Sequence, residues 1–159
     1  GNGIAVVSVG DFKYQGTIVG IKRNVRHLIQ DDNILYISTN KTGYVQKTDL
    51  NIMLDSFNRS PSKVNFLYKN WTSSYVGTGV RTIAKTNYKN YVFAAVNNSS
   101  ELVILDAKSL SIIGKMKADS YPVGMAISPD DKYLIVTSQG RRSAGGNSVM
   151  VFEIKENTK

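Results

Sequence analysis

Apolar and polar residues follow one another along most of the chain in short runs that suit β-strands. The runs at 34–39, 91–96 and 133–137 are rich in valine, isoleucine and tyrosine, and Gly, Asn, Asp, Ser or Pro residues bound them. β-Branched and aromatic side chains fit the pleated, half-buried surface of a sheet. Runs of about four to eight such residues between turn-forming residues predict strands. The pattern therefore predicts an all-β chain.

The strands recur in a repeating order. Segments 24–29, 79–84 and 122–127 align, and each is followed by a polar turn, a second apolar run, a polar loop and a third apolar run. The start of the chain fits the same frame, because residues 5–16 match residues 103–114 without a gap. Four strands in roughly 40 to 50 residues are typical of a β-propeller blade. The repeat predicts blades of four antiparallel strands, about three and a half of them, in an incomplete ring.

One segment has a different pattern. Leu50, Met53, Leu54 and Phe57 have the spacing of one helix face, and Asp49 before them is a good helix N-cap. Taken alone, the segment predicts a short amphipathic helix. The register of the repeat predicts a strand at the same place, and we favour the strand.

The last two repeats carry a recognisable motif. The run YPVGMAISPDDKYLIVT at 121–137, its continuation NSVMVF at 147–152, and LDA at 105–107 followed by SIIG at 111–114 resemble the YVTN family of β-propeller repeats. The resemblance is strongest over residues 80–154. Earlier repeats match loosely, since Ser8 and Thr48 stand where the family pattern has an aspartate like Asp106. The resemblance implies a propeller of the surface-layer-like or quinoprotein-like seven-bladed kind, and an extracytoplasmic location, periplasmic or at the cell surface.

The repeat divides the chain as one partial propeller domain, 1–159. We expect the second half of a blade at 1–23, a blade at 24–78 with a long loop at 58–79, a blade at 79–121, a blade without its last strand at 122–154, and a tail at 155–159. An open fan leaves apolar sheet faces and a strand edge exposed. We therefore expect partner strands elsewhere, either in a missing N-terminal segment or in a second chain.

The amino-acid composition excludes several classes of functional site. The 159 residues include no cysteine and one histidine, which excludes disulfides, thiol nucleophiles and His-rich metal sites. The net charge is +8, without a tight Lys/Arg cluster, and we expect no nucleic-acid partner. Apolar runs stay far below the roughly 18 residues of a membrane span. No cofactor fingerprint or catalytic set stands out, and we expect no cofactor or metal.

The candidate ligand-binding residues are Arg26, Arg81, Trp71, Tyr75, Arg141 and Arg142. Arg26 and Arg81 occupy equivalent repeat positions at the start of the innermost strand, where Gly124 stands in the third repeat, so both guanidiniums are expected near the mouth of the central channel. In the family that the chain resembles, the ligand face carries the two long loops that hold the other four residues. We expect these residues to converge on one face and to bind an anionic group together with a flat or apolar body.

Each candidate has a structural alternative. The arginines could bond backbone carbonyls or acids of neighbouring blades, and the aromatics Phe66, Tyr68 and Trp71 could cover a blade edge. His27 reads as a packed histidine, and the pairs Asp31-Asp32 and Asp130-Asp131 read as turn formers.

Three functions compete. The first is a non-enzymatic scaffold that binds a ligand or a protein through the loops near the channel. The second is the C-terminal part of a lactonase-like or quinoprotein-like propeller enzyme that acts on an anionic small molecule. The third is a structural repeat of a surface layer or cell wall. Propellers host all three roles, so the fold does not choose between them.

Overall fold

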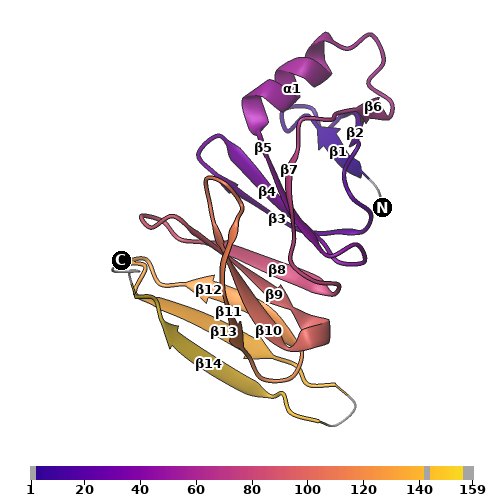
Figure 1. Ribbon diagram of the computed structural model, residues 1–159. Coiled ribbons are helices and arrows are strands. Elements are labelled where there is room, and N and C mark those ends of the chain that lie inside the picture. The colour runs from indigo at the N-terminus through magenta and orange to yellow at the C-terminus, as the bar shows by residue number, and fades with distance from the viewer. Residues whose placement is uncertain (1–2, 142–143, 156–159) are drawn as a thin grey trace.

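The computed structural model describes residues 3–141 and 144–155, which form a fan of four β-sheets placed side by side (Figure 1). The strands of each sheet follow the chain from an inner to an outer edge, as in a propeller blade. We name the sheets blades 1 to 4 in chain order. The all-β prediction is confirmed.

The two middle blades each have four strands. Blade 2 has the order β3 (Val25–Asp31), β4 (Ile34–Thr39), β5 (Tyr44–Asp49) and β7 (Thr72–Tyr75). Blade 3 has β8 (Val80–Lys85), β9 (Tyr91–Val96), β10 (Glu101–Asp106) and β11 (Ile112–Lys117), with a short 3-10 helix η1 (Asn97–Ser99) between β9 and β10. All neighbouring strands in these two sheets are antiparallel.

The outer blades are smaller. Blade 1 has the order β1 (Gly3–Val7), β2 (Tyr14–Val19) and β6 (Phe66–Leu67). Blade 4 has β12 (Pro122–Ile127), β13 (Tyr133–Ser138) and β14 (Ser148–Glu153). The inner strands β3, β8 and β12 lie next to one another, so they line the same side of the fan. The incomplete ring that the repeat predicts is confirmed.

Apolar cores fill the spaces between the blades. Between blades 2 and 3 lie residues such as Tyr36, Val45 and Leu110, and between blades 3 and 4 lie Phe93 and Leu134. A third core joins blade 1, blade 2 and a helix, with these buried members: Ile18, Ile21, Leu35, Ile37, Met53, Phe57 and Tyr68. Because each core needs two facing sheets, a blade is stabilised mainly by its neighbours.

The strand favoured at residues 50–57 is wrong, because the segment forms helix α1 (Leu50–Arg59). The Asp49 side chain accepts the backbone N–H of Ile52 and caps the helix, and Met53 and Phe57 turn inward. The fourth strand of blade 2 is β7, which comes after α1 and a further loop. Local capping and spacing therefore overrode the repeat register. No helix among the described residues has the length and apolar character to span a bilayer.

The segment from α1 to β7 covers the outer edge of blade 1. Phe66 of β6 pairs in parallel with Ile18 of β2, and Tyr68 packs edge-on against Trp71 with ring centroids 5.6 Å apart. Gly20 has φ +101°, and a Cβ there would lie 2.1 Å from the Tyr68 carbonyl oxygen, so only glycine permits this approach. The edge-covering alternative for these aromatics is confirmed.

Strand pairing corrects the alignment of the third repeat by one residue. Leu28 pairs with Ile37 and Ile83 with Ala94, whereas Met125 pairs with Val136. Each inner strand has a bulge just before these residues. The position of Arg26 and Arg81 is therefore taken by Val123 and not by Gly124, because Pro122, and not Val123, pairs with the last residue of the second strand as Val25 and Val80 do.

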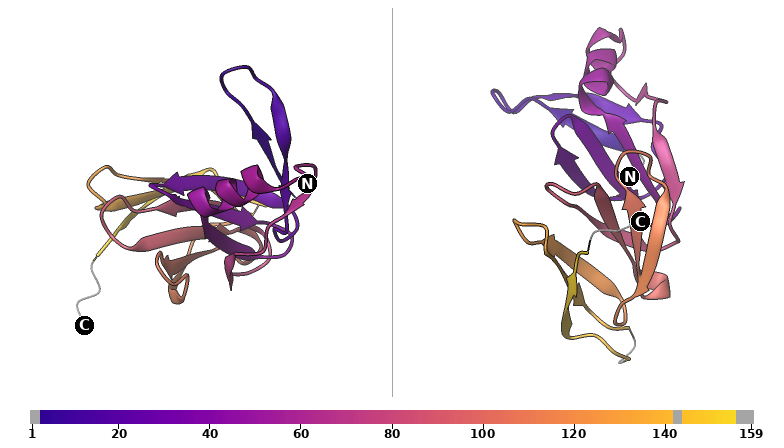
Figure 2. Two further views of the ribbon diagram at one scale, coloured as in Figure 1. Left: turned by 90° about the horizontal axis from the view of Figure 1, so that it is seen from above. Right: turned by 60° about the vertical axis from the view of Figure 1, so that its left-hand side comes forward.

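The blades have two rims, which Figure 2 shows from two sides. We call one rim the loop face: it carries the links between blades, near residues 20–24, 76–79 and 118–121, and the loops between second and third strands. We call the other the turn face: it carries the turns between first and second strands, near residues 32, 88 and 130, and the connections between third and fourth strands, including the start of α1.

Candidate functional site

The loop face gathers positive charge. Its basic residues come from blades 2 to 4 and from the link between blades 1 and 2: Lys22, Arg23, Arg26, Lys41, Arg81, Lys115, Lys117 and Arg141. Its described carboxylates are Glu101 and Asp119. Most aspartates lie instead on the turn face, in the turns between first and second strands and in the connections between third and fourth strands: Asp11, Asp31, Asp32, Asp49, Asp106, Asp130 and Asp131. Five of these seven carboxylates accept backbone N–H groups, the exceptions being Asp31 and Asp32. The positive net charge is therefore concentrated on the loop face.

Both loop-face carboxylates already have partners. Glu101 pairs with Lys117 at 2.9 Å, and hydrogen bonds from that lysine hold the pKa of Glu101 below its usual value. Asp119 accepts the Ser148 hydroxyl and the backbone N–H groups of Ser120 and Gly146, and these bonds lower the pKa of Asp119. Neither carboxylate is therefore free to pair with the arginines.

Arg26 and Arg81 lie on the bulges of adjacent inner strands, β3 and β8. In the described part of the chain, neither guanidinium makes an ion pair or a hydrogen bond; only the Arg81 carbonyl is bonded, by the Ser38 hydroxyl at 2.5 Å. The alternative of two arginines held by carbonyls or acids is therefore not seen. Both side chains keep their donors for an external group.

Tyr75 also lies on the loop-face side, at the outer strand of blade 2. Its ring meets Tyr44 edge-on with centroids 5.4 Å apart, and the Lys22 ammonium lies 5.0 Å from the Tyr44 centroid. This basic-aromatic group combines an apolar surface with a cation. Sequence reasoning found Tyr75 but missed Lys22 and Tyr44, because the group depends on the β5–β7 pairing.

Trp71 does not converge with Arg81, so that expectation is wrong. It precedes β7 at the turn-face end, where Thr72 pairs with Lys47, while Arg81 lies at the opposite rim. The physical reason is the helix: the long insertion starts from the connection after β5 and not from the link between blades. The Trp71 side chain is partly buried against the core of blades 1 and 2.

Arg141 lies on the loop face between β13 and β14, where it forms an isolated bridge with Ala144. The loop is held by Asp119, which bonds Gly146 and Ser148. A Cβ on Gly146 would lie 2.1 Å from the Gly140 nitrogen, so the loop closes tightly on itself. Arg142 lies outside the described residues.

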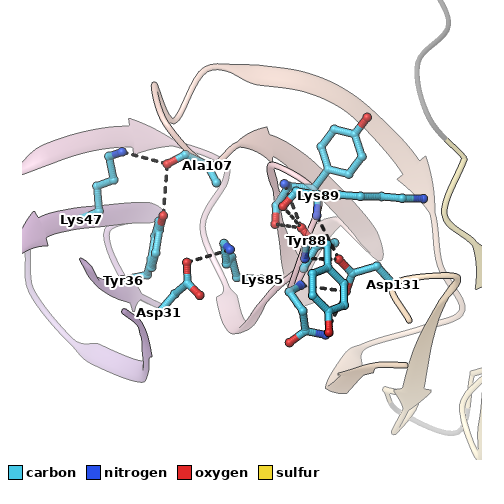
Figure 3. Close-up of polar contacts among 11 residues, drawn as sticks. Asp31, Tyr36, Lys47, Lys85, Tyr88, Lys89, Ala107 and Asp131 are labelled. Carbon is cyan, nitrogen blue, oxygen red and sulfur yellow. Dashed lines mark hydrogen bonds and ion pairs between the residues drawn. The ribbon is translucent and has the colours of Figure 1, made fainter. Parts of the chain in front are cut away.

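A second polar group lies on the turn face between blades 2 and 3 (Figure 3). We call it the blade 2–3 hollow; it is open to solvent and has a volume of about 510 Å³. Its lining residues are Asp31, Ile34, Tyr36, Lys47, Lys85, Tyr88, Lys89, Asn90, Ala107 and Lys108. Lys85 pairs with Asp31 at 2.7 Å, and Lys47 donates to the Ala107 carbonyl at 2.8 Å. The Lys89 ammonium points instead to the Ile154 carbonyl of blade 4, so the positive charge of the hollow beyond the ion pair comes from Lys47 and Lys108. Sequence reasoning missed it, since its residues come from separate strands.

Burial affects the groups that line this hollow. It raises the pKa of the Tyr36 hydroxyl, and the negative charges of Asp31 and Asp106 add to the rise. It lowers the pKa of the Lys47 ammonium, which Asp106 partly offsets. Each of these groups donates to a carbonyl of the next blade, so the hollow is also a junction between blades.

The turn reading is confirmed for Asp32 and Asp130, whereas Asp31 forms an ion pair with Lys85 and Asp131 bonds another blade. Asp130 bonds the Ser128 hydroxyl and the Lys132 N–H within its own turn, and the Ser128 bond lowers the pKa of Asp130 to about 2. Asp131 reaches across to blade 3 and accepts the backbone N–H groups of Asn87, Tyr88 and Lys89 at 2.6–3.0 Å. It therefore joins two adjacent blades.

Comparison with known proteins gives similar folds only among solved structures. Neither a protein-family model nor a curated protein matches the chain. Among solved structures it is similar to hydrazine synthase of Kuenenia stuttgartiensis (TM-score 0.62, 20% identity, 77% of this chain and 30% of that one). It is also similar to a chain of a mitotic checkpoint complex (TM-score 0.66, 13% identity, 86% and 38%) and to a candidate 6-phosphogluconolactonase of Bacteroides fragilis (TM-score 0.60, 20% identity, 82% and 35%).

The chain thus spans about a third of the length of these structures. They are β-propeller proteins that include enzymes and a member of a protein complex, so the likeness shows fold and not activity. The four sheets and these likenesses agree on one conclusion: the chain is a segment of a β-propeller.

Proposed function

We propose that this segment is a non-enzymatic binding scaffold whose loop face takes an acidic protein surface. The observation that carries the proposal is the segregation of charge, with unpaired Arg26 and Arg81 near the inner edge of a basic face. A face of one sign attracts a partner of the other sign and speeds its encounter.

The breadth of the face favours a protein over a small molecule. Basic residues extend from Lys22 beside blade 1 to Arg141 in blade 4, and Tyr75 adds an aromatic contact near the rim. The described hollows do not include Arg26, Arg81 or Arg141 in their walls. An open surface with scattered charges fits another surface better than it fits an enclosed ligand.

The setting of this scaffold follows the resemblance to YVTN repeats. On that basis we place it outside the cytoplasm, at the cell surface or in the periplasm. One of the solved neighbours belongs to a protein complex, which supports a role in assembly without naming a partner.

Binding of poly-L-glutamate, used as a probe for an acidic protein surface, tests the proposal. The double variant Arg26→Gln/Arg81→Gln is expected to weaken binding about tenfold at low salt, since each exposed charge pair is worth roughly 0.2–1 kcal/mol. The matched control is Lys13→Gln/Lys132→Gln, which removes the same charge from the turn face. Equal weakening by both double variants would show that only net charge matters, and would overturn the loop-face assignment.

The blade 2–3 hollow favours a second candidate, an enzyme or carrier for an anionic small molecule. Its lysines, its two tyrosines and its volume suit a phosphate or carboxylate with a small body. Calorimetry with inorganic phosphate and with 6-phosphogluconate tests it. Lys108→Gln is the variant of choice, because Lys108 is exposed and its side chain makes no bond in the described structure. Millimolar or tighter binding that this variant weakens would favour the second candidate over the scaffold.

A further inference from the structure

The first hairpin, β1–β2, is a structural copy of β10–β11. Each carries a register shift at the same place, and the Ser8 N–H bonds the Lys13 carbonyl at 2.9 Å just as the Asp106 N–H bonds that of Ser111. The match extends to the tip, where Phe12 and Leu110 have φ values of +55° and +58°. Val9 therefore corresponds to Ala107, and Phe12 to Leu110.

The corresponding residues have opposite environments. Ala107 and Leu110 are 3% and 2% exposed, because they pack against blade 2. Val9 and Phe12 are both 81% exposed. Exposed aromatic and aliphatic residues at positions that are buried in the neighbouring repeat indicate a missing contact and not a solvent-adapted hairpin.

The polar contacts at the tip repeat as well. The Ala107 carbonyl accepts from Tyr36 and Lys47 of blade 2, and the corresponding Ile154 carbonyl accepts from Lys89 of blade 3 at 2.8 Å. Twice, then, a lysine of one blade bonds this carbonyl in the next. Within the described residues the Val9 carbonyl has no such donor.

The inner side of blade 1 is open in the same way. β1 is the inner edge of its sheet, whereas the corresponding β10 pairs on its inner side with β9, which in turn pairs with the inner strand β8. Leu28 of blade 2 faces this opening and is 44% exposed, while Ile83 at the corresponding position of blade 3 is 1% exposed.

We infer that the face of blade 1 formed by β1 and the hairpin tip docks against a preceding four-stranded propeller blade, and that two inner strands complete the sheet, one paired to β1 and the other paired to the first. The docked blade places an apolar hollow around Val9 and Phe12 and a lysine or hydroxyl donor at the Val9 carbonyl. This continues the interfaces seen between blades 2 and 3 and between blades 3 and 4.

A second copy of the chain is a poorer occupant. Its blade 4 exposes Val149 and Val151, which would cover the hairpin of another copy. All three strands of blade 4 belong to its own sheet, however, so a docked blade 4 would not supply the two inner strands that blade 1 lacks. Leu28 would stay exposed.

Thiol labelling tests the surface, since the chain has no cysteine of its own. In the 159-residue chain we expect Val9→Cys to react at the rate of a free thiol, and Ala107→Cys at least about tenfold more slowly, because reaction there needs local opening. Rates for Val9→Cys that fall as protein concentration rises would show that a second copy covers the face, and would overturn the inference. Slow labelling at every concentration would overturn it too.

A chimaera tests the occupant. Residues 24–100 joined in front of residue 3 supply one whole blade and two inner strands in register, because Gly3 corresponds to Glu101. Labelling of Val9→Cys is expected to slow at least about tenfold in this longer chain, with Tyr88→Cys in blade 3 of the original segment as the unchanged control. Unchanged labelling of Val9→Cys, whether the added blade folds or not, would count against a blade as occupant.

Discussion

The backbone N–H of Ile83 donates to Nδ1 of His27 across the boundary between blades 2 and 3, at 3.3 Å. The bulge in β8 frees this N–H from its own sheet, so the imidazole supplies the missing acceptor. Only a neutral ring can accept at Nδ1. Burial also lowers the pKa of His27 from the ordinary value of 6.5.

This contact predicts a pH dependence of stability. Because the folded-state pKa of His27 is depressed, the unfolded chain binds the extra proton first, and stability falls as pH drops below about 6.5. His27→Gln is expected to flatten the free energy of unfolding between pH 5.5 and 8. Urea unfolding at both pH values measures this, and an equally steep dependence in the variant would contradict it.

Leu110 and Phe12 provide a matched pair for stability. Leu110→Ala is expected to cost about 2–5 kcal/mol of unfolding free energy, the usual loss for a buried leucine. Phe12→Ala at the corresponding tip should stay within about 0.5 kcal/mol, because its side chain is exposed. Chemical denaturation of both variants gives the comparison, and a large loss for Phe12→Ala would show contacts within the segment.

Asp131 is expected to be the more important of the two adjacent aspartates. Asp131→Ala leaves three backbone N–H groups of the blade 3 turn without an acceptor, which should cost about 3 kcal/mol. Asp130→Ala removes bonds within one exposed turn and should cost much less. Thermal unfolding of the two variants measures both losses of stability. Equal losses, or a larger loss for Asp130→Ala, would contradict this prediction.

Trp71 is expected to act as a packing residue. Its Nε1 is buried without a hydrogen-bond partner in the described structure. Trp71→Phe removes that unsatisfied donor and keeps an aromatic ring, so the loss of stability should stay below about 1 kcal/mol. Binding of poly-L-glutamate should not change. Weaker binding in this variant would restore Trp71 to the binding surface.

Repeats made most of the fold predictable from sequence. Apolar and polar runs alternate along the chain, and this alternation made residues 5–16 match residues 103–114. The structure confirms the match, because the two hairpins have the same strand register. The misses have local causes. A capped apolar stripe after Asp49 outweighed the repeat, and the similar apolar residues of the third inner strand allowed an alignment one residue out of the register that strand pairing shows.

The candidate site was less predictable. Equivalent positions in the repeat found Arg26 and Arg81, and the structure adds that both guanidiniums lack partners in the described chain. Lys22 and Lys47 escaped notice, because their surroundings come from other strands and blades. Trp71 was assigned to the loop face, because the sequence does not show that the long insertion follows β5 on the turn face.

Hydrogen bonds near the inner edge run from one blade to the next: the Ser38 hydroxyl of β4 donates to the Arg81 carbonyl of β8, and the Thr82 hydroxyl of β8 donates to the Val123 carbonyl of β12. A row of units coupled only to nearest neighbours unfolds from its free ends inward. Strand β9 lies in blade 3, which has a blade on either side, and its residues 92–96 are at most 3% exposed, so its amide hydrogens should exchange most slowly with solvent. Those of β1 and β14 should exchange first, so that the segment frays at both ends while its middle remains folded.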